Sequence, residues 1–256
     1  MEDRILILNG STGIAAAAAR LAAKAGARLV IATADEASGI ELASETGAEL
    51  WTGDLARPGA AESVLGLCIS KFGRVDALFN ASGLSGRRYG DGPVHECTDE
   101  GWEITLTRNL TVTFHLCRAV IGRMLDQAAG PSGIRGAVLN MGSALADSPE
   151  PRHFAHHAYA ASKGAVVALS RAMAACYAPQ QIRVNVLAPS MVRTPAGERG
   201  ADPELHEFLR KKQPLTGGMV EAEDVARAAI FLLSDAAAAI TGQVLTVDAA
   251  WSLSGV

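Results

Sequence analysis

The chain has 256 residues, of which 49% are hydrophobic and 20% are charged, a composition suited to the large core of a single α/β domain. Its net charge is −4 and it has no basic stripe, which argues against nucleic acid or an anionic membrane as a partner. No apolar run reaches the ~18 residues of a membrane span, and the four cysteines lack metal-ligand spacing, so we expect a cytoplasmic protein without a metal site.

Short apolar runs alternate with helical segments through the first third of the chain. Continuous apolar strands at this spacing are typical of a parallel sheet buried on both faces, with right-handed helical crossovers. The turn after the first strand contains Gly10 and Gly13 and leads directly into a helix, so it is either a phosphate-binding loop or a simple tight turn. The predicted strands lie at residues 5–8, 28–33, 49–51 and 75–79, and the predicted helices at 15–25, 38–46 and 60–72.

The same alternation continues through the rest of the chain. The loop at residues 144–157 holds His153, His156 and His157 without an acidic ligand at metal spacing, so we expect these histidines to be exposed to solvent. Residues 190–216 are polar and interrupted by prolines, which predicts a mobile lid over the carboxyl ends of the strands. The remaining predicted helices lie at residues 99–128, 158–178, 203–212 and 221–233, and the remaining strands at 137–141, 183–187 and 242–247.

This pattern contains no linker or repeat, which predicts one domain over residues 1–256. The fold class that it indicates is α/β, with a Rossmann-type, doubly wound, seven-stranded parallel sheet between two layers of helices. In such a sheet, ligands bind outside the carboxyl ends of the strands. Side chains that carry chemistry are therefore expected in the segments that follow each strand.

Tyr159 and Lys163 are the most informative pair in these segments. In the predicted helix at residues 158–178, side chains four residues apart lie on the same face, so a phenol and an ammonium are held side by side. A phenol has a pKa near ~10, and a neighbouring cation favours the phenolate and lowers that value. The pair is either a general acid/base device tuned by the lysine or a solvated surface pair.

With this pair in the same chain as the glycine turn, the sequence resembles the short-chain dehydrogenase/reductase family along essentially its whole length. Asn109 falls on the family's catalytic asparagine, and Asn140-Met141-Gly142-Ser143 resembles the segment whose last serine is catalytic. The resemblance therefore implies Asn109, Ser143, Tyr159 and Lys163 as the catalytic residues. It further implies contacts with a dinucleotide from Gly10, Ser11, Thr12, Gly13, Ile14, Thr33, Asp54, Leu55, Asn80, Ala81, Ser82, Tyr159, Lys163, Pro189, Val192 and Thr194.

The glycine turn departs from the family's pattern, Thr-Gly-x-x-x-Gly-x-Gly. The segment from Asn9 to Ala15 is one residue shorter and ends in alanine where the family has its last glycine. The alanine is tolerable because that position mainly governs helix packing, whereas the missing residue tightens the loop around the pyrophosphate. This departure motivates a rival hypothesis, a catalytically weak relative that binds or senses a dinucleotide. A dehydratase or isomerase on the same scaffold is a third interpretation.

The activity that the resemblance implies is hydride transfer between NAD(P)(H) and a carbonyl or secondary alcohol, as in a 3-oxoacyl reductase or a small-alcohol dehydrogenase. Tyr159 is expected to exchange the proton, and Lys163 to lower the pKa of the phenol and hold the nicotinamide ribose. Ser143 is expected to hydrogen-bond the substrate oxygen. Asn109 is expected to hold a water that links Lys163 to solvent.

NAD(H) is favoured over NADP(H) by the residues at the end of the second strand. Thr33-Ala34-Asp35-Glu36 offers no cation for a 2′-phosphate and two acids that could accept hydrogen bonds from a ribose. NADP(H) is the alternative, because Thr33 stands where the family's NAD-selecting aspartate would align.

The expected partners are a small-molecule substrate and further copies of the chain. In the family, the tyrosine-bearing helix packs against a partner subunit. Small residues recur along this helix at Ala161, Gly164, Ala165, Ala168 and Ala172, which permits close helix packing. We therefore expect a homotetramer or, failing that, a homodimer.

Overall fold

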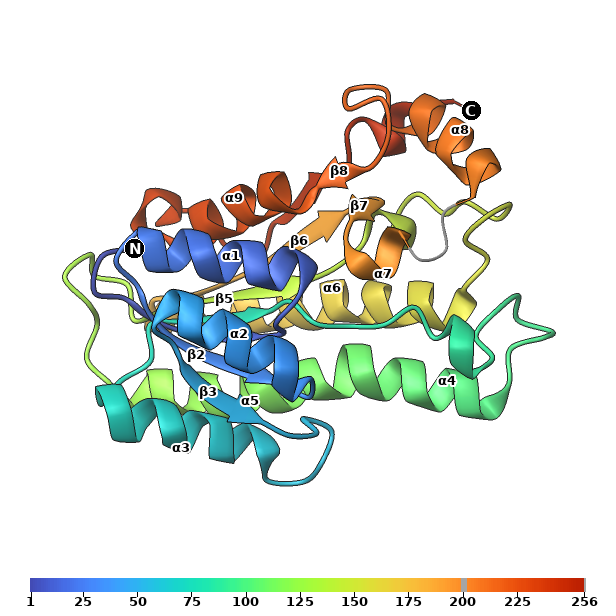
Figure 1. Ribbon diagram of the computed structural model, residues 1–256. Coiled ribbons are helices and arrows are strands. Elements are labelled where there is room, and N and C mark those ends of the chain that lie inside the picture. The colour runs from blue at the N-terminus through green and yellow to red at the C-terminus, as the bar shows by residue number, and fades with distance from the viewer. Residues whose placement is uncertain (199–201, 256) are drawn as a thin grey trace.

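The computed structural model describes residues 1–198 and 202–255 (Figure 1). Within these residues, seven strands form one parallel sheet in the order β3-β2-β1-β4-β5-β6-β9, which confirms the predicted doubly wound sheet. A separate short pair joins β7 to β8. The strands are β1 (Ile5–Asn9), β2 (Arg28–Thr33), β3 (Glu49–Thr52), β4 (Ala77–Asn80), β5 (Gly136–Met141), β6 (Ile182–Pro189), β7 (Val192–Arg193), β8 (Val220–Glu221) and β9 (Val244–Val247).

Helices cover both faces of the sheet. In Figure 1, α1 and α9 lie above the sheet and α3 and α5 lie below it. The first layer holds α1 (Gly13–Lys24), α2 (Glu36–Thr46) and α9 (Ala222–Leu233), and the second holds α3 (Ala60–Phe72), α4 (Asp99–Leu106), α5 (Val112–Asp126) and α6 (His157–Tyr177). The short helices α7 (Pro195–Glu198) and α8 (Pro203–Lys212) belong to the segment predicted as a lid.

Two apolar cores lie on opposite faces of the sheet. Alternate residues of β1 divide between them, with Leu6 and Leu8 packing toward α1 and α9 while Ile5 and Ile7 pack toward α3 and α5. Side chains of a strand alternate between faces, so a continuous apolar run is what a strand covered on both sides requires. The apolar runs of the sequence therefore have a direct structural cause.

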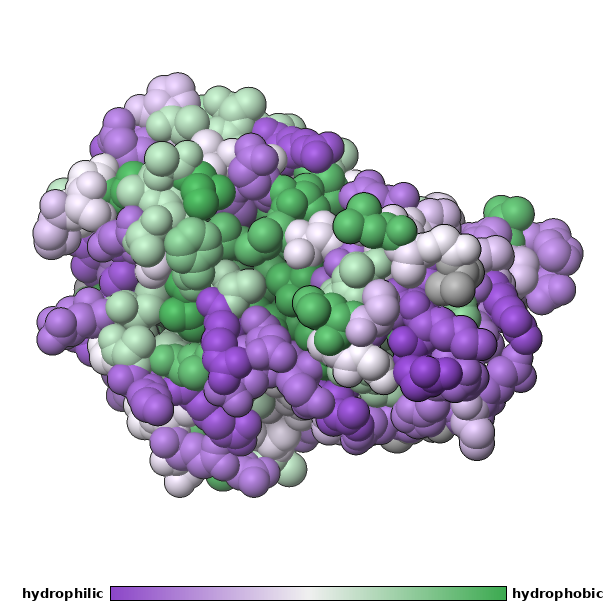
Figure 2. All heavy atoms as spheres, turned by 90° about the horizontal axis from the view of Figure 1, so that it is seen from above, coloured by the Kyte–Doolittle hydropathy of each residue, from purple (hydrophilic) through white to green (hydrophobic). Residues whose placement is uncertain are grey.

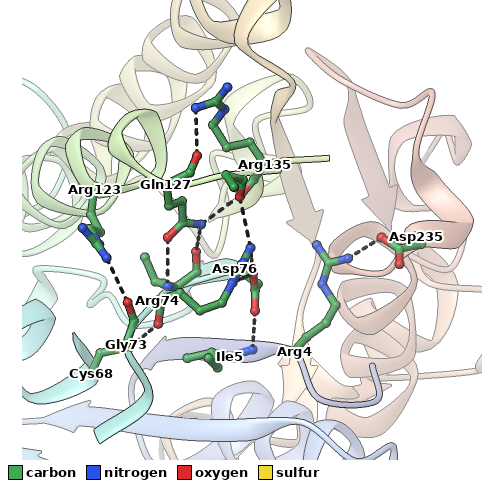
Figure 3. Close-up of polar contacts among 12 residues, drawn as sticks. Arg4, Ile5, Cys68, Gly73, Arg74, Asp76, Arg123, Gln127, Arg135 and Asp235 are labelled. Atoms are coloured by element: carbon green, nitrogen blue, oxygen red, sulfur yellow. Dashed lines mark hydrogen bonds and ion pairs between the residues drawn. The ribbon is translucent and has the colours of Figure 1, made fainter. Parts of the chain in front are cut away.

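The edge of the sheet opposite the carboxyl ends of the strands is closed by arginine side chains (Figure 3). Arg123 donates to the Gly73 carbonyl at the end of α3, and Arg135 donates to the Leu125 carbonyl in the last turn of α5. Arg183, which is buried, donates to the Leu232 carbonyl in the last turn of α9. The last carbonyls of a helix lack partners within the helix, so these cations stabilise three helix C-termini.

The order in which successive strands are added to the sheet reverses between β1 and β4. β2 and β3 lie on one side of β1, whereas β4, β5, β6 and β9 follow on the other. The carboxyl ends of β1 and β4 are neighbours, with Asn9 opposite Asn80. A crevice at such a switch point is where open α/β sheets bind their ligands.

Most predicted element boundaries agree with the structure, and one helix does not. Residues 28–33, 60–72 and 203–212 coincide with β2, α3 and α8. The helix predicted over residues 99–128 is instead α4 and α5 joined by one wider π turn, Thr107–Thr111. Single-turn 3-10 helices occur at Arg87–Tyr89, Ala144–Ala146, Ala178–Gln180, Asp235–Ala237 and Trp251–Leu253.

The predicted lid, residues 190–216, is described except for residues 199–201, which lie outside the described residues. Its helix α8 packs Leu205 and Leu209 into an apolar cluster with Trp251 and Ala144, which follows directly on Ser143. Seen from above (Figure 2), hydrophobic atoms gather across the middle of the face and polar atoms cover its rims. Among the helices that the structure describes, none is long and apolar enough to cross a membrane.

Candidate active site

Lys163 lies in the interior of the protein, on the face of α6 that packs against β5. Lys163 is only 2% exposed, and its Nζ donates to the carbonyl of Met141 at 2.8 Å. Nζ lies 5.7 Å from the centroid of the Tyr159 ring. Burial lowers the pKa of Lys163 to about 8. Lys163 is therefore buried and Tyr159 is half-buried, so the two are not a solvated surface pair.

Tyr159 lies next to Ser143, which follows the end of β5. Ser143 is buried, and its Oγ accepts a hydrogen bond from the amide of Leu145. Burial raises the pKa of Tyr159, and a hydrogen bond with Ser143 opposes that rise. The expected lowering by Lys163 is not what the structure gives, because the Nζ is directed at a carbonyl and the desolvation of the phenol dominates.

Asn109 occupies the π turn between α4 and α5. Its Oδ1 accepts from the amide of Leu84 at 2.8 Å, and its Nδ2 donates to the carbonyl of Leu84 at 2.9 Å and to Ser162 Oγ at 3.0 Å. The turn widens the helix and allows a polar residue in its interior to face the neighbouring loop. Asn109 thus joins α4, α6 and the segment after β4, and its side-chain amide is bound to protein groups.

Gly83 lies where Asn109 of the π turn and Lys163 of α6 leave little room for a side chain. A Cβ added there would lie 2.8 Å from Asn109 Oδ1 and 3.2 Å from Lys163 Nζ. The backbone after β4 therefore runs directly against two of the predicted catalytic side chains. Neither Gly83 nor Ser162 was assigned a role from sequence, and the Asn80-Ala81-Ser82-Gly83 segment was the signal that could have found the first.

The glycine loop after β1 lies between the segments that follow β4 and β6. A Cβ on Gly10 would lie 2.9 Å from that of Ala15 and 3.5 Å from that of Ser82, and one on Gly13 would lie 2.8 Å from Thr194 Cγ2. Both glycines have positive φ, 117° and 53°. The backbone amides of Thr12, Gly13 and Ile14 stand at the N-terminus of α1, where amides have no partner one turn back. Pro189 ends β6 and Val192 is buried in β7, so both lie in the segment that brings Thr194 to the loop.

Three hydroxyls meet where the glycine loop touches the end of β2. Ser11 Oγ is 2.8 Å from Thr33 Oγ1 and 2.7 Å from Ser38 Oγ in α2. Ser11 and Thr33 are buried. Asp35 accepts from the Ser38 amide and begins α2. The shortened loop is thus tied to β2 and α2 through Ser11, and sequence reasoning missed the contribution of Ser38.

Asp54, in the segment after β3, pairs with Arg108 of the π turn. A second contact of this ion pair joins Arg108 Nη2 to Asp54 Oδ2 at 3.3 Å. The hydrogen bond from Arg108, followed by the bond from the Ala56 amide, holds the pKa of Asp54 below its usual range. The next residue, Leu55, is buried. Arg108 is a further residue at this edge that sequence reasoning missed.

Asn80 sends its side chain into the core and not toward the crevice. Its Nδ2 donates to Asn140 Oδ1 at 2.8 Å, and Asn140 Nδ2 donates to Ser170 Oγ at 2.9 Å. Ser82 donates to the side chain of Asn9, which links the ends of β4 and β1. The side chain of Asn80 therefore does not reach the crevice, and the Ala81 amide donates to the Phe79 carbonyl at 3.1 Å.

The prediction that all three histidines are solvent-exposed is wrong for His156. His156 is 8% exposed and its Nε2 accepts from Arg87 Nε at 2.9 Å. Burial, with the charge of Arg87, lowers the pKa of His156. The ring of His153 is half-buried, 4.7 Å from that of Phe208 in α8. Among the described residues, no group of His, Cys, Asp and Glu is arranged to hold a metal ion.

Comparison with known proteins identifies relatives over the whole chain. A family model described as enoyl-(acyl carrier protein) reductase matches residues 9–252. D-threitol dehydrogenase of Mycolicibacterium smegmatis is 33% identical, over 99% of this chain and 94% of its own. A protein of Xanthobacter autotrophicus named inactive 2-(S)-hydroxypropyl-CoM dehydrogenase 2 is 37% identical, over 90% of this chain and 97% of its own.

A solved structure shares the fold. The 3-ketoacyl-(acyl-carrier-protein) reductase of Brucella melitensis, crystallised with NADH, superposes with a TM-score of 0.86 and is 27% identical, over 98% of this chain and 99% of its own. Fold, family match and relatives agree with the arrangement of residues around β5 and α6. The chain belongs to the short-chain dehydrogenase/reductase family and is an oxidoreductase that moves hydride between a nicotinamide cofactor and an alcohol or carbonyl compound.

Proposed function

We propose that Tyr159 exchanges the reacting proton in an NAD(H)-dependent interconversion of a ketone and a secondary alcohol. The observation that carries the proposal is the position of Tyr159 beside the buried Ser143, with the Nζ of the buried Lys163 5.7 Å from the centroid of the Tyr159 ring. The nicotinamide supplies or accepts the hydride. Tyr159 donates its proton to the carbonyl oxygen during reduction and takes it back during oxidation. Because burial raises its pKa, the phenol is protonated at neutral pH, the form that reduction needs.

The neighbouring side chains support this proton transfer. Ser143 donates to the substrate oxygen and stabilises the charge that develops on it. Lys163 keeps a positive charge within reach of the phenol up to about pH 8 and holds the nicotinamide ribose. Asn109 holds the Leu84 backbone against α6 through both ends of its amide. The Asn109 carbonyl accepts from Thr113 Oγ1 at 2.8 Å, which leaves its second lone pair for the water that we expected on Asn109.

The glycine loop fits a dinucleotide. Side chains are absent from Gly10 and Gly13 at the two points where a Cβ would strike a neighbouring element, and the first turn of α1 begins directly after the loop, where helix amides suit a phosphate. Thr194 and Val192 border the loop from the β6 side and suit the nicotinamide end, with Pro189 before them. Asp54 and Leu55 border the adenine end. The shorter loop is compensated by the Ser11 contacts, which supports a functional cofactor site over the weakly binding alternative.

NAD(H) is the cofactor that the ribose end favours. Within the part of the chain that the structure describes, the cluster of Ser11, Thr33 and Ser38 contains hydroxyls and no Arg or Lys. Asp35, at the start of α2, is exposed, and its charge repels a 2′-phosphate. The related reductase solved with NADH is consistent with this preference. Fluorescence titration of both reduced cofactors tests it, and tighter binding of NADPH would contradict it.

The substrate class is a 3-oxoacyl compound or a small secondary alcohol. The lid at residues 190–216 packs Leu205 and Leu209 against Trp251 and Ala144, next to Ser143, which supports a substrate with an apolar carbon skeleton. The relative named for D-threitol supports a small polyol as the other candidate. A panel of 3-oxoacyl thioesters, aliphatic ketones and four-carbon polyols, followed by NADH absorbance, separates these classes.

Tyr159→Phe is the decisive test of the mechanism. Loss of the proton donor is expected to lower kcat by about 10²–10⁴-fold with NADH binding unchanged. Tyr177→Phe, at the opposite end of the same helix, is the matched control and should retain wild-type kcat. If the wild type turns over no ketone or alcohol, the chain resembles its relative that is named inactive. If Tyr159→Phe keeps wild-type rate, the assignment of the proton donor is wrong.

The helices α5 and α6 offer a surface for self-association. Ala161, Ala168 and Ala172 are exposed on α6, and Phe114 of α5 is 42% exposed. A shallow hollow of about 390 Å³ lies between the helices, lined by Leu110, Thr111, Phe114, Ala165 and Leu169. We expect a homotetramer, or a homodimer through this face alone, and light scattering of the wild type and of Phe114→Glu tests both.

A cytoplasmic location is the last element of the proposal. Cys68, Cys97, Cys117 and Cys176 are all free thiols, which supports a reducing compartment. Cell fractionation with an antibody against the chain is the measurement. Recovery in an oxidising compartment would contradict it.

A further inference from the structure

The catalytic helix α6 begins without a capping side chain of its own. His156 stands at its N-cap and makes no side-chain cap bond, and the first turn contains no acidic residue in the described structure. The first intrahelical bond runs from the Ala160 amide to the His156 carbonyl. The amides of residues 157, 158 and 159 precede this bond, so each needs a partner from elsewhere.

A distant loop supplies all three partners. The His157 amide donates to the Gly92 carbonyl at 3.1 Å. The Ala158 amide donates to Asp91 Oδ1 at 2.9 Å, and the Tyr159 amide donates to Asp91 Oδ2 at 3.0 Å. The carboxylate of Asp91 therefore binds the backbone of the very residue whose phenol faces Ser143.

The loop is built to present this carboxylate. Asp91 is 5% exposed and sits where backbone and α4 approach closely. A Cβ on Gly86 would lie 2.0 Å from Thr105 Oγ1, and one on Gly101 would lie 2.5 Å from the backbone of Gly90. These approaches leave Asp91 little freedom, so its geometry is set before substrate binds.

The same loop also touches the other side chains of the site. It leaves β4 through Gly83, against Asn109 and Lys163, and is held at Leu84 by both ends of the Asn109 amide. Asp91, seven residues after Leu84 in the same loop, accepts a hydrogen bond from the Tyr159 amide. One segment thus connects Asn109, Lys163 and Tyr159 by a continuous set of contacts.

We propose that Asp91 is a positioning residue that fixes Tyr159 relative to Ser143 and Lys163 by capping α6 from the loop at residues 83–94. A shift of about 1 Å in a reacting group can cost about 10²-fold in rate, so the alignment of this helix end matters to the chemistry. The inference rests on the proposed proton transfer by Tyr159.

The test compares Asp91→Ala with a substitution of Asp76, a second buried carboxylate that accepts from a backbone amide. Asp76 is 8% exposed, accepts from the Ile5 amide at 3.0 Å and binds Arg74 at the opposite edge of the sheet (Figure 3). Asp91→Ala is expected to lower kcat by about 10–100-fold, with the dissociation constant of NADH within two-fold of wild type. Asp76→Asn is expected to lower the melting temperature and leave kcat per folded molecule unchanged.

Asp91→Asn provides a second variant that keeps the size of the side chain. Its NH2 group replaces one of the two accepting oxygens, so one of the two backbone amides loses its acceptor and kcat should fall between those of the wild type and the alanine variant. This variant decides the question alone if Asp91→Ala does not fold. Wild-type kcat in Asp91→Asn, or a loss that Asp76→Asn reproduces, overturns the proposal. Absence of turnover in the wild type refutes the proposed function instead.

Discussion

Lys163→Met is expected to stabilise the fold while it removes activity. Lys163 is 2% exposed, and burial moves its pKa from 10.5 to about 8. Each pKa unit corresponds to about 1.4 kcal/mol, so a charged ammonium at this position costs the folded state about 3 kcal/mol at pH 7. Methionine has a similar length without the charge. The lost bond to the Met141 carbonyl costs about 1–2 kcal/mol, which leaves a net gain of about 1–2 kcal/mol.

The dependence on pH gives this prediction its sign. Between pH 8 and 10.5 the unfolded chain keeps the lysine proton that the folded chain has released, so the free energy of unfolding of the wild type rises with pH across this window. The methionine variant has no such proton and should lack this part of the rise. The gain of about 3 kcal/mol from removing the charge is therefore full at neutral pH and disappears toward pH 10.5, where the lost bond to the Met141 carbonyl leaves the methionine variant about 1–2 kcal/mol less stable than the wild type.

Thermal unfolding at pH 7 and pH 9.5 is the assay, with Lys24→Met as the control at an exposed lysine. A gain of about 1–2 kcal/mol raises the Tm by about 2–8 °C in a chain of this size. Lys24→Met should change the Tm little at either pH. A Tm of Lys163→Met below that of the wild type at pH 7 would refute the reasoning, because it would mean that the buried charge is satisfied.

Three further predictions concern the same edge of the sheet. Gly83→Ala should lower kcat by about ten-fold and reduce the free energy of unfolding by about 1–3 kcal/mol, because its Cβ would meet Asn109 Oδ1 at 2.8 Å; steady-state rates and urea titration measure the two effects. Gly13→Ala should weaken NADH binding by about ten-fold or more, because the added Cβ would meet the Thr194 side chain. Adding Thr194→Ala to this variant should recover part of the loss. Equal NADH affinity in the wild type, the single variant and the double variant would contradict a dinucleotide site at the glycine loop. The rate of alcohol oxidation should rise steadily with pH toward and beyond 10, because the pKa of Tyr159 is raised and the phenol must lose its proton before it can accept another. The rate of ketone reduction should stay level below pH 8. An oxidation rate that is already constant above pH 7 would contradict the raised pKa of Tyr159.

Local sequence signals accounted for the layers of the fold. β2 and α3 were predicted to the residue because their boundaries are marked locally, by an apolar run in the first case and by Gly59 and Gly73 at both ends of the helix in the second. The π turn at Thr107–Thr111 had no comparable marker. Its only local sign was Asn109 in a helix interior, and what stabilises it is contact with Leu84 and Ser162.

The candidate site likewise contains residues that local patterns predict and contacts that they do not. Tyr159, Lys163 and Ser143 were predicted from a spacing and a short motif, and the structure brings all three together at the end of β5. Arg108 with Asp54, and Asp91 with Tyr159, join residues 54 and 68 positions apart, and no local pattern encodes such pairs. The same is true of His156, whose burial depends on Arg87, 69 residues earlier in the chain.

The ends of the sheet determine how copies of this chain can meet. The two edge strands, β3 and β9, have four residues each, whereas β6 in the interior has eight. A strand of four residues offers few free backbone groups to a neighbouring chain, and Glu49 and Lys71 add an ion pair at the β3 edge. Growth by strand addition, the route to fibres, is therefore obstructed at both ends. The homo-oligomer proposed above would therefore form through helix faces such as that of α5 and α6, where a two-fold contact would close on itself and limit the number of subunits.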